Sequence, residues 1–127
     1  MRLDLALVKQ WVRPNARVLD LGCGDGELLA HLRDTLNVRG YGLEIDPDKL
    51  TAAIARGVNV IEQDLNKGLS NYSDDSFDTL LMAQALQAVQ RPDELLDDMV
   101  RAAREVSVTV PNVRPWTTRW YVLRHGR

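Results

Sequence analysis

The fold of this chain is decided by residues 18–27, which read Val-Leu-Asp-Leu-Gly-Cys-Gly-Asp-Gly-Glu. An apolar run of strand type ends at Leu21 and gives way to three alternate glycines, after which leucines recur at helical spacing. Glycine lets the backbone turn sharply and leaves no side chain between the backbone and a ligand. The stretch therefore predicts a strand that ends on Asp20 and Leu21, a ligand-binding loop and the start of a helix.

The glycine spacing separates two kinds of nucleotide site. A dinucleotide loop has the pattern Gly-x-Gly-x-x-Gly, but the sixth residue counted from Gly22 is Glu27. Asp20, Asp25 and Glu27 lie near the place of a pyrophosphate and would repel it, whereas they would attract an amino group or a sulfonium. The loop therefore favours a small, partly cationic ligand over a dinucleotide. An ordinary tight turn between strand and helix is the alternative.

Size and composition indicate one domain over residues 1–127. The chain has 45% hydrophobic and 27% charged residues, which is typical of a globular protein. No apolar run approaches the roughly 18 residues of a membrane span, and we find no secretory signal. Cys23 is the single cysteine and cannot form an internal disulfide, so we expect a cytoplasmic protein.

Charge is spread unevenly along the chain. Four arginines and no acid lie in residues 114–127, so this end carries +4 and residues 1–113 carry −6. An acidic body argues against nucleic acid as the main partner. The basic, aromatic tail, residues 113–127, could contact RNA, an anionic membrane or a protein partner. The alternative is a last helix whose arginines extend from an aromatic face.

Helical and strand patterns alternate through the chain. We expect strands at residues 17–21, 41–44, 58–63, 77–83 and 106–110, and helical stretches at residues 3–12, 28–36, 47–56 and 92–103. This alternation predicts a parallel sheet with helices on both faces and right-handed crossovers. The class is therefore α/β.

Carboxylates follow three neighbouring strands of this sheet. Glu44 lies 22 residues after Gly22, the separation at which a βαβ unit brings its second strand end beside the first loop, and its carboxylate can accept both hydroxyls of a ribose. Asp46 precedes Pro47 and reads as a helix N-cap, although the two acids could exchange these roles. Asp64 ends the third strand.

The acidic-x-Gly-x-Gly-x-Gly pattern of residues 20–26 resembles motif I of the class I S-adenosylmethionine-dependent methyltransferases. The resemblance implies that the loop holds the methionine half of the cofactor and that Asp64 and Leu65 lie at the adenine. Asp64 could instead only cap the turn at residues 66–68. The cofactor-binding residues expected on this basis are Asp20, Gly22, Cys23, Gly24, Gly26, Glu44, Ile45, Asp64, Leu65 and Ala83.

Residues 18–27, 40–47, 57–65 and 83–89 together are similar to the MetW family of methionine biosynthesis proteins. The resemblance implies a Rossmann-like class I methyltransferase fold with strand order 3-2-1-4-5. We expect this chain to depart from the family in being C-terminally short. It also implies binding of S-adenosylmethionine or S-adenosylhomocysteine and action with homoserine O-acyltransferase, MetX. Two alternatives stay open, which are an active small-molecule methyltransferase and an interaction module whose cofactor site is vestigial.

No catalytic residue stands out. Methyl transfer from a sulfonium depends mostly on positioning, so a base is optional. The fourth strand leads into Ala-Gln-Ala-Leu at residues 83–86, where amide or adenine methyltransferases carry Asn/Asp-Pro-Pro-aromatic, and this disfavours those substrates. His31 and His125 read as structural or solvated residues. We expect no metal site.

Overall fold

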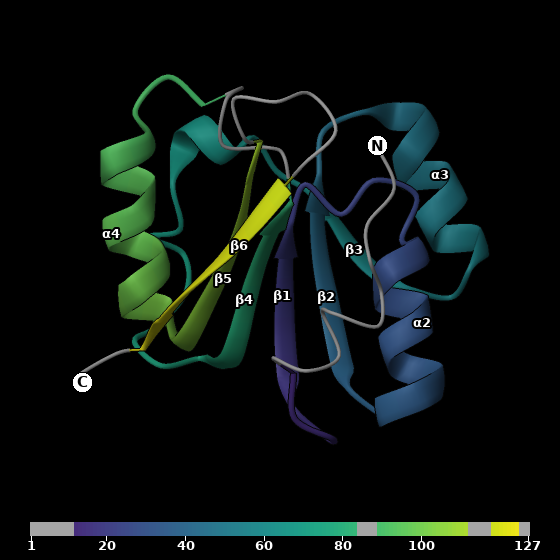
Figure 1. The fold of residues 1–127 in the computed structure, drawn as a ribbon. Coiled ribbons are helices and arrows are strands. Elements are labelled where there is room, and N and C mark those ends of the chain that lie inside the picture. Colours follow the sequence, from purple (N-terminus) through teal and green to yellow (C-terminus); the bar gives the residue numbers. More distant parts are fainter. Residues whose placement is uncertain (1–11, 84–88, 112–117, 125–127) are drawn as a thin grey trace.

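The computed structural model describes residues 12–83, 89–111 and 118–124, which form a six-stranded sheet in the order β3-β2-β1-β4-β5-β6 (Figure 1). The strands are β1 (Arg17–Leu21), β2 (Arg39–Glu44), β3 (Asn59–Glu62), β4 (Phe77–Ala83), β5 (Ala103–Pro111) and β6 (Thr118–Arg124). The helices are α2 (Glu27–Leu36), α3 (Pro47–Ala55) and α4 (Pro92–Ala102), with a 3₁₀ turn, η1 (Leu65–Lys67). Strands β1 to β5 are parallel, which confirms the expected order 3-2-1-4-5.

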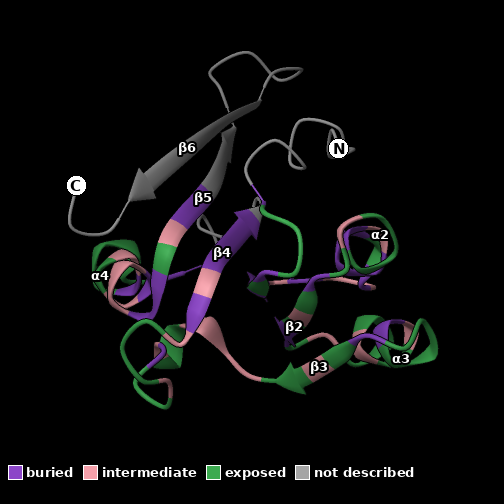
Figure 2. Cartoon of the chain, turned by 90° about the horizontal axis from the view of Figure 1, so that it is seen from below, coloured by how far each residue is buried: buried purple, intermediate pink, exposed green. Residues whose placement is uncertain are grey.

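Helices cover both faces of the sheet, as the alternation predicted. Helices α2 and α3 lie on one face and α4 on the other (Figures 1 and 2). Successive β1 side chains point to opposite faces of the sheet. Val18 packs with the leucines of α2, whereas Leu19 packs with Leu95 and Met99 of α4. Both β1 side chains and both α4 side chains are buried, so the sheet is the centre of the core.

The strand register sets the strand ends at one edge. In the parallel ladder, Leu21 lies opposite both Leu43 and Met82, and Glu44 lies opposite Glu62. The loops after β1, β2, β3 and β4 therefore all leave from the carboxyl edge of the sheet. Ligands bind at this edge in open α/β sheets.

The chain end differs from one expectation. Residues 118–124 are a strand, β6, that pairs antiparallel with β5 from Pro111↔Thr118 to Glu105↔Arg124. The alternative of a last helix is therefore wrong, and β6 covers the edge of β5. Its composition, Thr-Arg-Trp-Tyr-Val-Leu-Arg, is rich in aromatic and β-branched residues, which favour strands.

Other differences from the expected boundaries are small. The third strand is shorter than predicted, and the fifth begins at Ala103, directly after α4. The helix expected over residues 3–12 and most of the exit loop after β4 lie outside the described residues. Within the described part of the chain, no helix has the length and apolar character of a membrane span.

The crossover from β3 to β4 contains only η1 and loops, and α4 holds it in place. Asp98 accepts a hydrogen bond from the amide of Leu69 at 2.8 Å. Arg101 donates to the carbonyl oxygens of Leu69 and Tyr72 at 2.9 and 2.8 Å and pairs with Asp74 at 2.9 Å. These side-chain bonds replace the crossover helix that usually joins two parallel strands.

Candidate functional site

The loop at residues 22–26 explains the three alternate glycines. Gly22, Gly24 and Gly26 have φ of 74°, 61° and 81°, the left-handed region that favours glycine. A Cβ added to Gly24 would meet no atom within 4 Å, so this part of the loop faces open space. A Cβ added to Gly26 would lie 3.0 Å from Val58, so Gly26 lets α2 begin close to its neighbours.

The loop amides point at β2. Gly22 and Cys23 both donate to the carbonyl oxygen of Leu43, at 2.8 and 3.0 Å, and Gly24 donates to Oε1 of Glu44 at 2.8 Å. A loop that binds pyrophosphate turns such amides toward the anion. Here three consecutive amides are already bonded, which supports the sequence-based argument against a dinucleotide.

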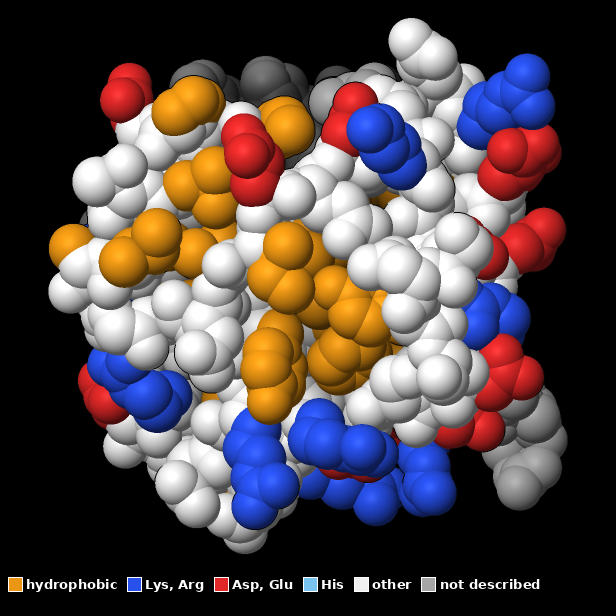
Figure 3. Space-filling view, turned by 180° about the vertical axis from the view of Figure 1, so that it is seen from behind, with side chains coloured by type: hydrophobic (Ala, Val, Ile, Leu, Met, Phe, Trp, Pro, Cys, Tyr) orange, Lys and Arg blue, Asp and Glu red, His pale blue; other side chains and the backbone are white. Residues whose placement is uncertain are grey.

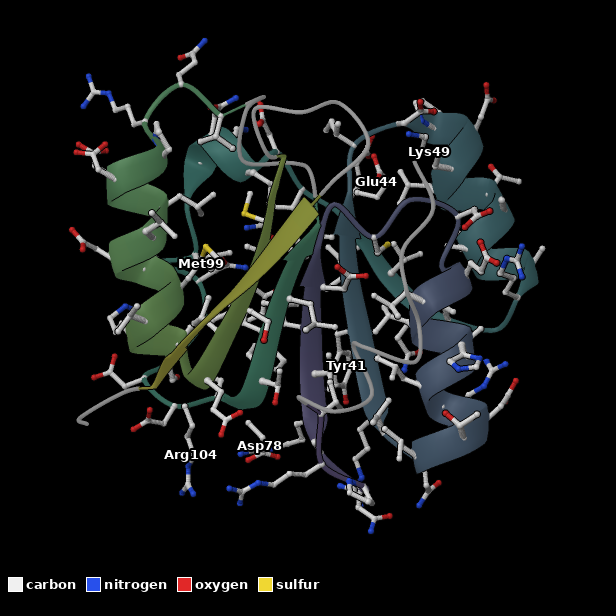
Figure 4. The ribbon with its side chains drawn as sticks, in the orientation of Figure 1. Tyr41, Glu44, Lys49, Asp78, Met99 and Arg104 are labelled. Carbon is white, nitrogen blue, oxygen red and sulfur yellow. The ribbon has the colours of Figure 1, made fainter. Side chains whose placement is uncertain are left out.

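Glu44 joins the glycine loop to the end of β2 and lies at the upper end of the sheet in Figure 4. Its side chain is buried, and Oε2 accepts from the amides of Ile45 and Asp46, both at 3.0 Å. A carboxylate offers about four lone-pair sites, and three are used here. One site is left, so a ribose could gain a second hydrogen bond from Glu44 only by sharing an oxygen with an amide.

Asp46 is the N-cap of α3. Its Oδ1 accepts from the amides of Asp48 and Lys49 at 2.9 and 3.4 Å, and Pro47 follows at the first helical position. The assignment of the cap to Asp46 is therefore confirmed, and the exchanged assignment is wrong. Glu44 is free of any capping role and keeps its carboxylate beside the loop.

Asp20 is the most deeply buried carboxylate of the site, with 3% of its surface exposed. No described residue donates a hydrogen bond to its side chain. Burial, with a smaller contribution from the nearby charge of Glu44, raises the pKa of Asp20 to about 7. A cationic group bound next to these two carboxylates would offset both effects.

The Cys23 thiol donates a long hydrogen bond, 3.6 Å from sulfur to oxygen, to the carbonyl of Gly24 within the loop. A Cβ on Gly42 of β2 would lie 2.4 Å from the sulfur, so the thiol packs directly against that glycine. Burial, together with the charges of Asp20 and Glu44, raises the pKa of Cys23 to about 12. The group is a buried, protonated thiol that does not act as a nucleophile.

Two residues of the site were missed by the sequence analysis. Gly42 is needed for the contact with Cys23, and the signal was a glycine in the interior of a strand, which marks a close approach. Arg56, after α3, pairs with Asp25 of the loop at 3.5 Å. No local pattern joins Arg56 to a loop 31 positions earlier in the sequence.

The other expected residues lie along the same edge. Ile45 is 54% exposed, an unusual state for a large aliphatic side chain beside a ligand loop. Asp64 accepts a hydrogen bond from the amide of Asn66 at 2.9 Å and so caps η1, while its expected place at the adenine stays a prediction. Leu65 packs against the α4 side of the core, and Ala83 is the last residue of β4. Among the described residues no group of three or more potential ligands could hold a metal ion.

The fold and this loop define a class of protein. Solved structures with the same fold include a methyltransferase of Thermotoga maritima dependent on S-adenosylmethionine, with TM-score 0.70, 25% identity, and 85% of this chain and 50% of that one covered. Phosphoethanolamine N-methyltransferase 2 of Haemonchus contortus, solved with S-adenosyl-L-methionine, has TM-score 0.74 at 20% identity. The match covers 84% of this chain and 27% of that one. The chain has the Rossmann-like fold of class I methyltransferases.

The sequence gives the family. Residues 2–127 match the model of the family "Methionine biosynthesis protein MetW", and the chain belongs to that family. The bifunctional methionine biosynthesis protein MetXA/MetW of Rhodopirellula baltica is 36% identical over 100% of this chain and 22% of its own length. Norajmaline N-methyltransferase of Rauvolfia serpentina is 27% identical over 68% of this chain and 32% of its own length. The chain thus spans about a fifth of the length of the first relative and about a third of the length of the second.

Proposed function

We propose that this chain binds S-adenosylmethionine or S-adenosylhomocysteine at the carboxyl edge of the sheet and acts with homoserine O-acyltransferase in methionine biosynthesis. One observation carries the cofactor proposal. The glycine loop is bonded through its amides to β2, leaves open space at Gly24 and is backed by the buried carboxylates of Asp20 and Glu44. Such a loop suits a ligand with an amino group and a sulfonium and repels an anionic one.

Different residues of the site would bind different parts of the cofactor. The loop and Asp20 would hold the methionine half, Glu44 one ribose hydroxyl, and the exposed side chain of Ile45 one face of the adenine. Asp64 and Leu65 would lie at the other end of the adenine. The bound cofactor supplies a reactive methyl group, and the acceptor would enter over Ala83, where residues 84–88 lie outside the described structure.

Calorimetric titration with S-adenosylhomocysteine tests the cofactor assignment. Glu44→Ala should lose about 1.5–3 kcal/mol of binding free energy, because it removes a hydrogen bond to a charged group. Glu62→Ala is the matched control, since Glu62 lies opposite Glu44 in the ladder but is exposed. Equal affinity of the Glu44 variant and the wild type would reject the ribose assignment. Absence of binding by the wild type would reject the cofactor proposal and favour a vestigial site.

The partner proposal is supported by the relative in which MetXA and MetW stand in one bifunctional protein. Size-exclusion chromatography with the acyltransferase of the same genome, with and without S-adenosylmethionine, tests it. Co-elution supports a partnership, and a shift that depends on the cofactor would make the chain a sensor of it. Separate elution together with transfer of labelled methyl to homoserine or a lysate metabolite would favour an independent methyltransferase. The cytoplasmic location stays a prediction.

A further inference from the structure

Among the residues that the structure describes, no helix covers one part of the sheet. Parallel sheets are usually covered on both faces, but the crossover from β3 to β4 supplies only the three residues of η1. Helix α4 covers β4 and β5 on this face, through Leu95 and Met99. The α4 side of β2 and β3 is therefore open in the described part of the chain, since Tyr41 and Ile61 are exposed there. Figure 3 shows hydrophobic side chains gathered on the back of the molecule.

Aromatic and aliphatic side chains fill this open sheet face, which we define as Tyr41, Ile61, Tyr72 and Phe77. Tyr41 and Ile61 project on the α4 side because they alternate with residues that face α2 and α3, and they are 38% and 49% exposed. The Phe77 ring lies edge-on to both tyrosines, with centroid distances of 6.1 and 5.4 Å. Phe77 is buried and Tyr72 partly buried, so Tyr41 and Ile61 form the exposed part of this face. Exposed apolar side chains that lie together mark an interaction site.

Arginines border the open sheet face at the amino ends of the strands. Arg17, Arg39 and Arg104 are exposed and lie at or next to the first residue of β1, β2 and β5. Within the described residues, Arg17 has an ion pair with Asp78 at 3.8 Å, whereas none is found for Arg39 or Arg104. Figure 3 shows Lys and Arg side chains gathered below the hydrophobic ones.

We propose that the open sheet face is the docking surface for the acyltransferase partner, which would present an apolar patch edged by carboxylates. This rests on the proposed function. Charge favours such a partner over a second copy of this chain, because two copies meeting through this face would bring equal arginine borders together. In the bifunctional relative MetXA/MetW, the part similar to this chain and the MetXA part belong to one protein.

Position on the sheet lets docking and cofactor binding occur together. Tyr41 and the arginines lie at the amino ends of the strands, whereas Glu44 and the glycine loop lie at the carboxyl ends (Figure 4). A strand rises about 3.3 Å per residue, so along β2 Arg39 lies roughly 16 Å and Tyr41 roughly 10 Å from Glu44, whereas Ile61 lies opposite Leu43, one residue before Glu44. A partner held by Tyr41 and the arginine border would therefore sit toward the amino ends of the strands and leave the glycine loop uncovered.

Calorimetric titration of the full chain into the acyltransferase of the same genome tests the docking surface. Ile61→Glu and Arg39→Glu should each weaken binding at least tenfold, because the first places a charge in the apolar centre and the second reverses a border charge. Ile54→Glu is the matched control, since Ile54 is 64% exposed on α3, on the opposite face, and its binding should stay within twofold of the wild type. Thermal unfolding of each variant checks that it is folded.

The outcomes separate the two proposals. Wild-type binding that neither Ile61→Glu nor Arg39→Glu weakens would overturn the docking surface and leave the partnership standing. No binding by the wild type would overturn both. A wild-type dimer in sedimentation that Ile61→Glu abolishes would assign the open sheet face to a second copy of the chain and would likewise overturn the proposal.

Discussion

The buried carboxylate of Asp20 makes the stability of this protein depend on pH in an unusual direction. Most paired carboxyl groups have lowered pKa values, and the stability that they contribute to the fold is lost as the pH falls. Burial instead raises the pKa of Asp20 from 3.8 to about 7, so the folded chain holds a proton that the unfolded chain releases. Raising the pH from about 4 through 7 therefore costs stability, and the cost is complete above the folded-state pKa.

The size of this effect follows from the shift. One pKa unit corresponds to about 1.4 kcal/mol, so a rise of roughly three units gives a loss of about 4 kcal/mol between pH 4 and pH 8. Asp20 is almost wholly buried, so solvent screening reduces this figure little. Asparagine has nearly the same shape and does not titrate. The difference in unfolding free energy between Asp20→Asn and the wild type should therefore grow by about that amount as the pH rises.

Urea unfolding followed by circular dichroism, at pH steps from 4 to 8.5, measures this difference. The control is Glu27→Gln, which removes an exposed carboxylate at the end of the same loop. Its difference from the wild type should stay nearly constant over the range. A constant difference for Asp20→Asn as well would refute the reasoning, because it would mean that Asp20 titrates alike in the folded and unfolded chains.

Two further predictions concern Cys23 and its neighbour. Gly42→Ala should lower the free energy of unfolding in urea by about 1–3 kcal/mol, because the new Cβ would lie 2.4 Å from the Cys23 sulfur. The double variant Gly42→Ala, Cys23→Ala should recover part of this loss, and failure to do so would show that the thiol is not the obstacle. At pH 8 the folded chain should react with iodoacetamide at least a hundredfold more slowly than the urea-unfolded chain, since the pKa of Cys23 is raised to about 12. Equal rates, read by mass spectrometry, would contradict the buried, protonated thiol.

Local sequence patterns predicted the parts of the fold that depend on near neighbours in the chain. The alternation of apolar runs and helical stripes was enough for the five parallel strands, and β4 has the predicted bounds of Phe77–Ala83. The cap at Asp46 was predicted because Asp-Pro before an apolar stripe is a local signal. The place of Glu44 at a strand end was likewise predictable from its distance to the glycine loop.

The remaining features depend on contacts between distant segments. The bonds from the loop amides to Leu43 and Glu44 require the exact stagger of β1 against β2, which no motif encodes. The antiparallel pairing of β6 requires knowledge of which edge is free, and reading its aromatic residues as one face of a helix missed their strand preference. The arginine that holds the β3–β4 crossover lies 32 positions after Leu69 in the sequence.

The way α4 holds that crossover also bears on the order of folding. The amide of Leu69 is protected by Asp98, and its carbonyl by Arg101, so neither bond can form until α4 has packed on the sheet. We therefore expect the β3–β4 segment to be fully ordered only when α4 is docked, although α4 follows it in the chain. Hydrogen exchange at the Leu69 amide would report the undocking of α4, and its rate would separate that local opening from global unfolding of the sheet.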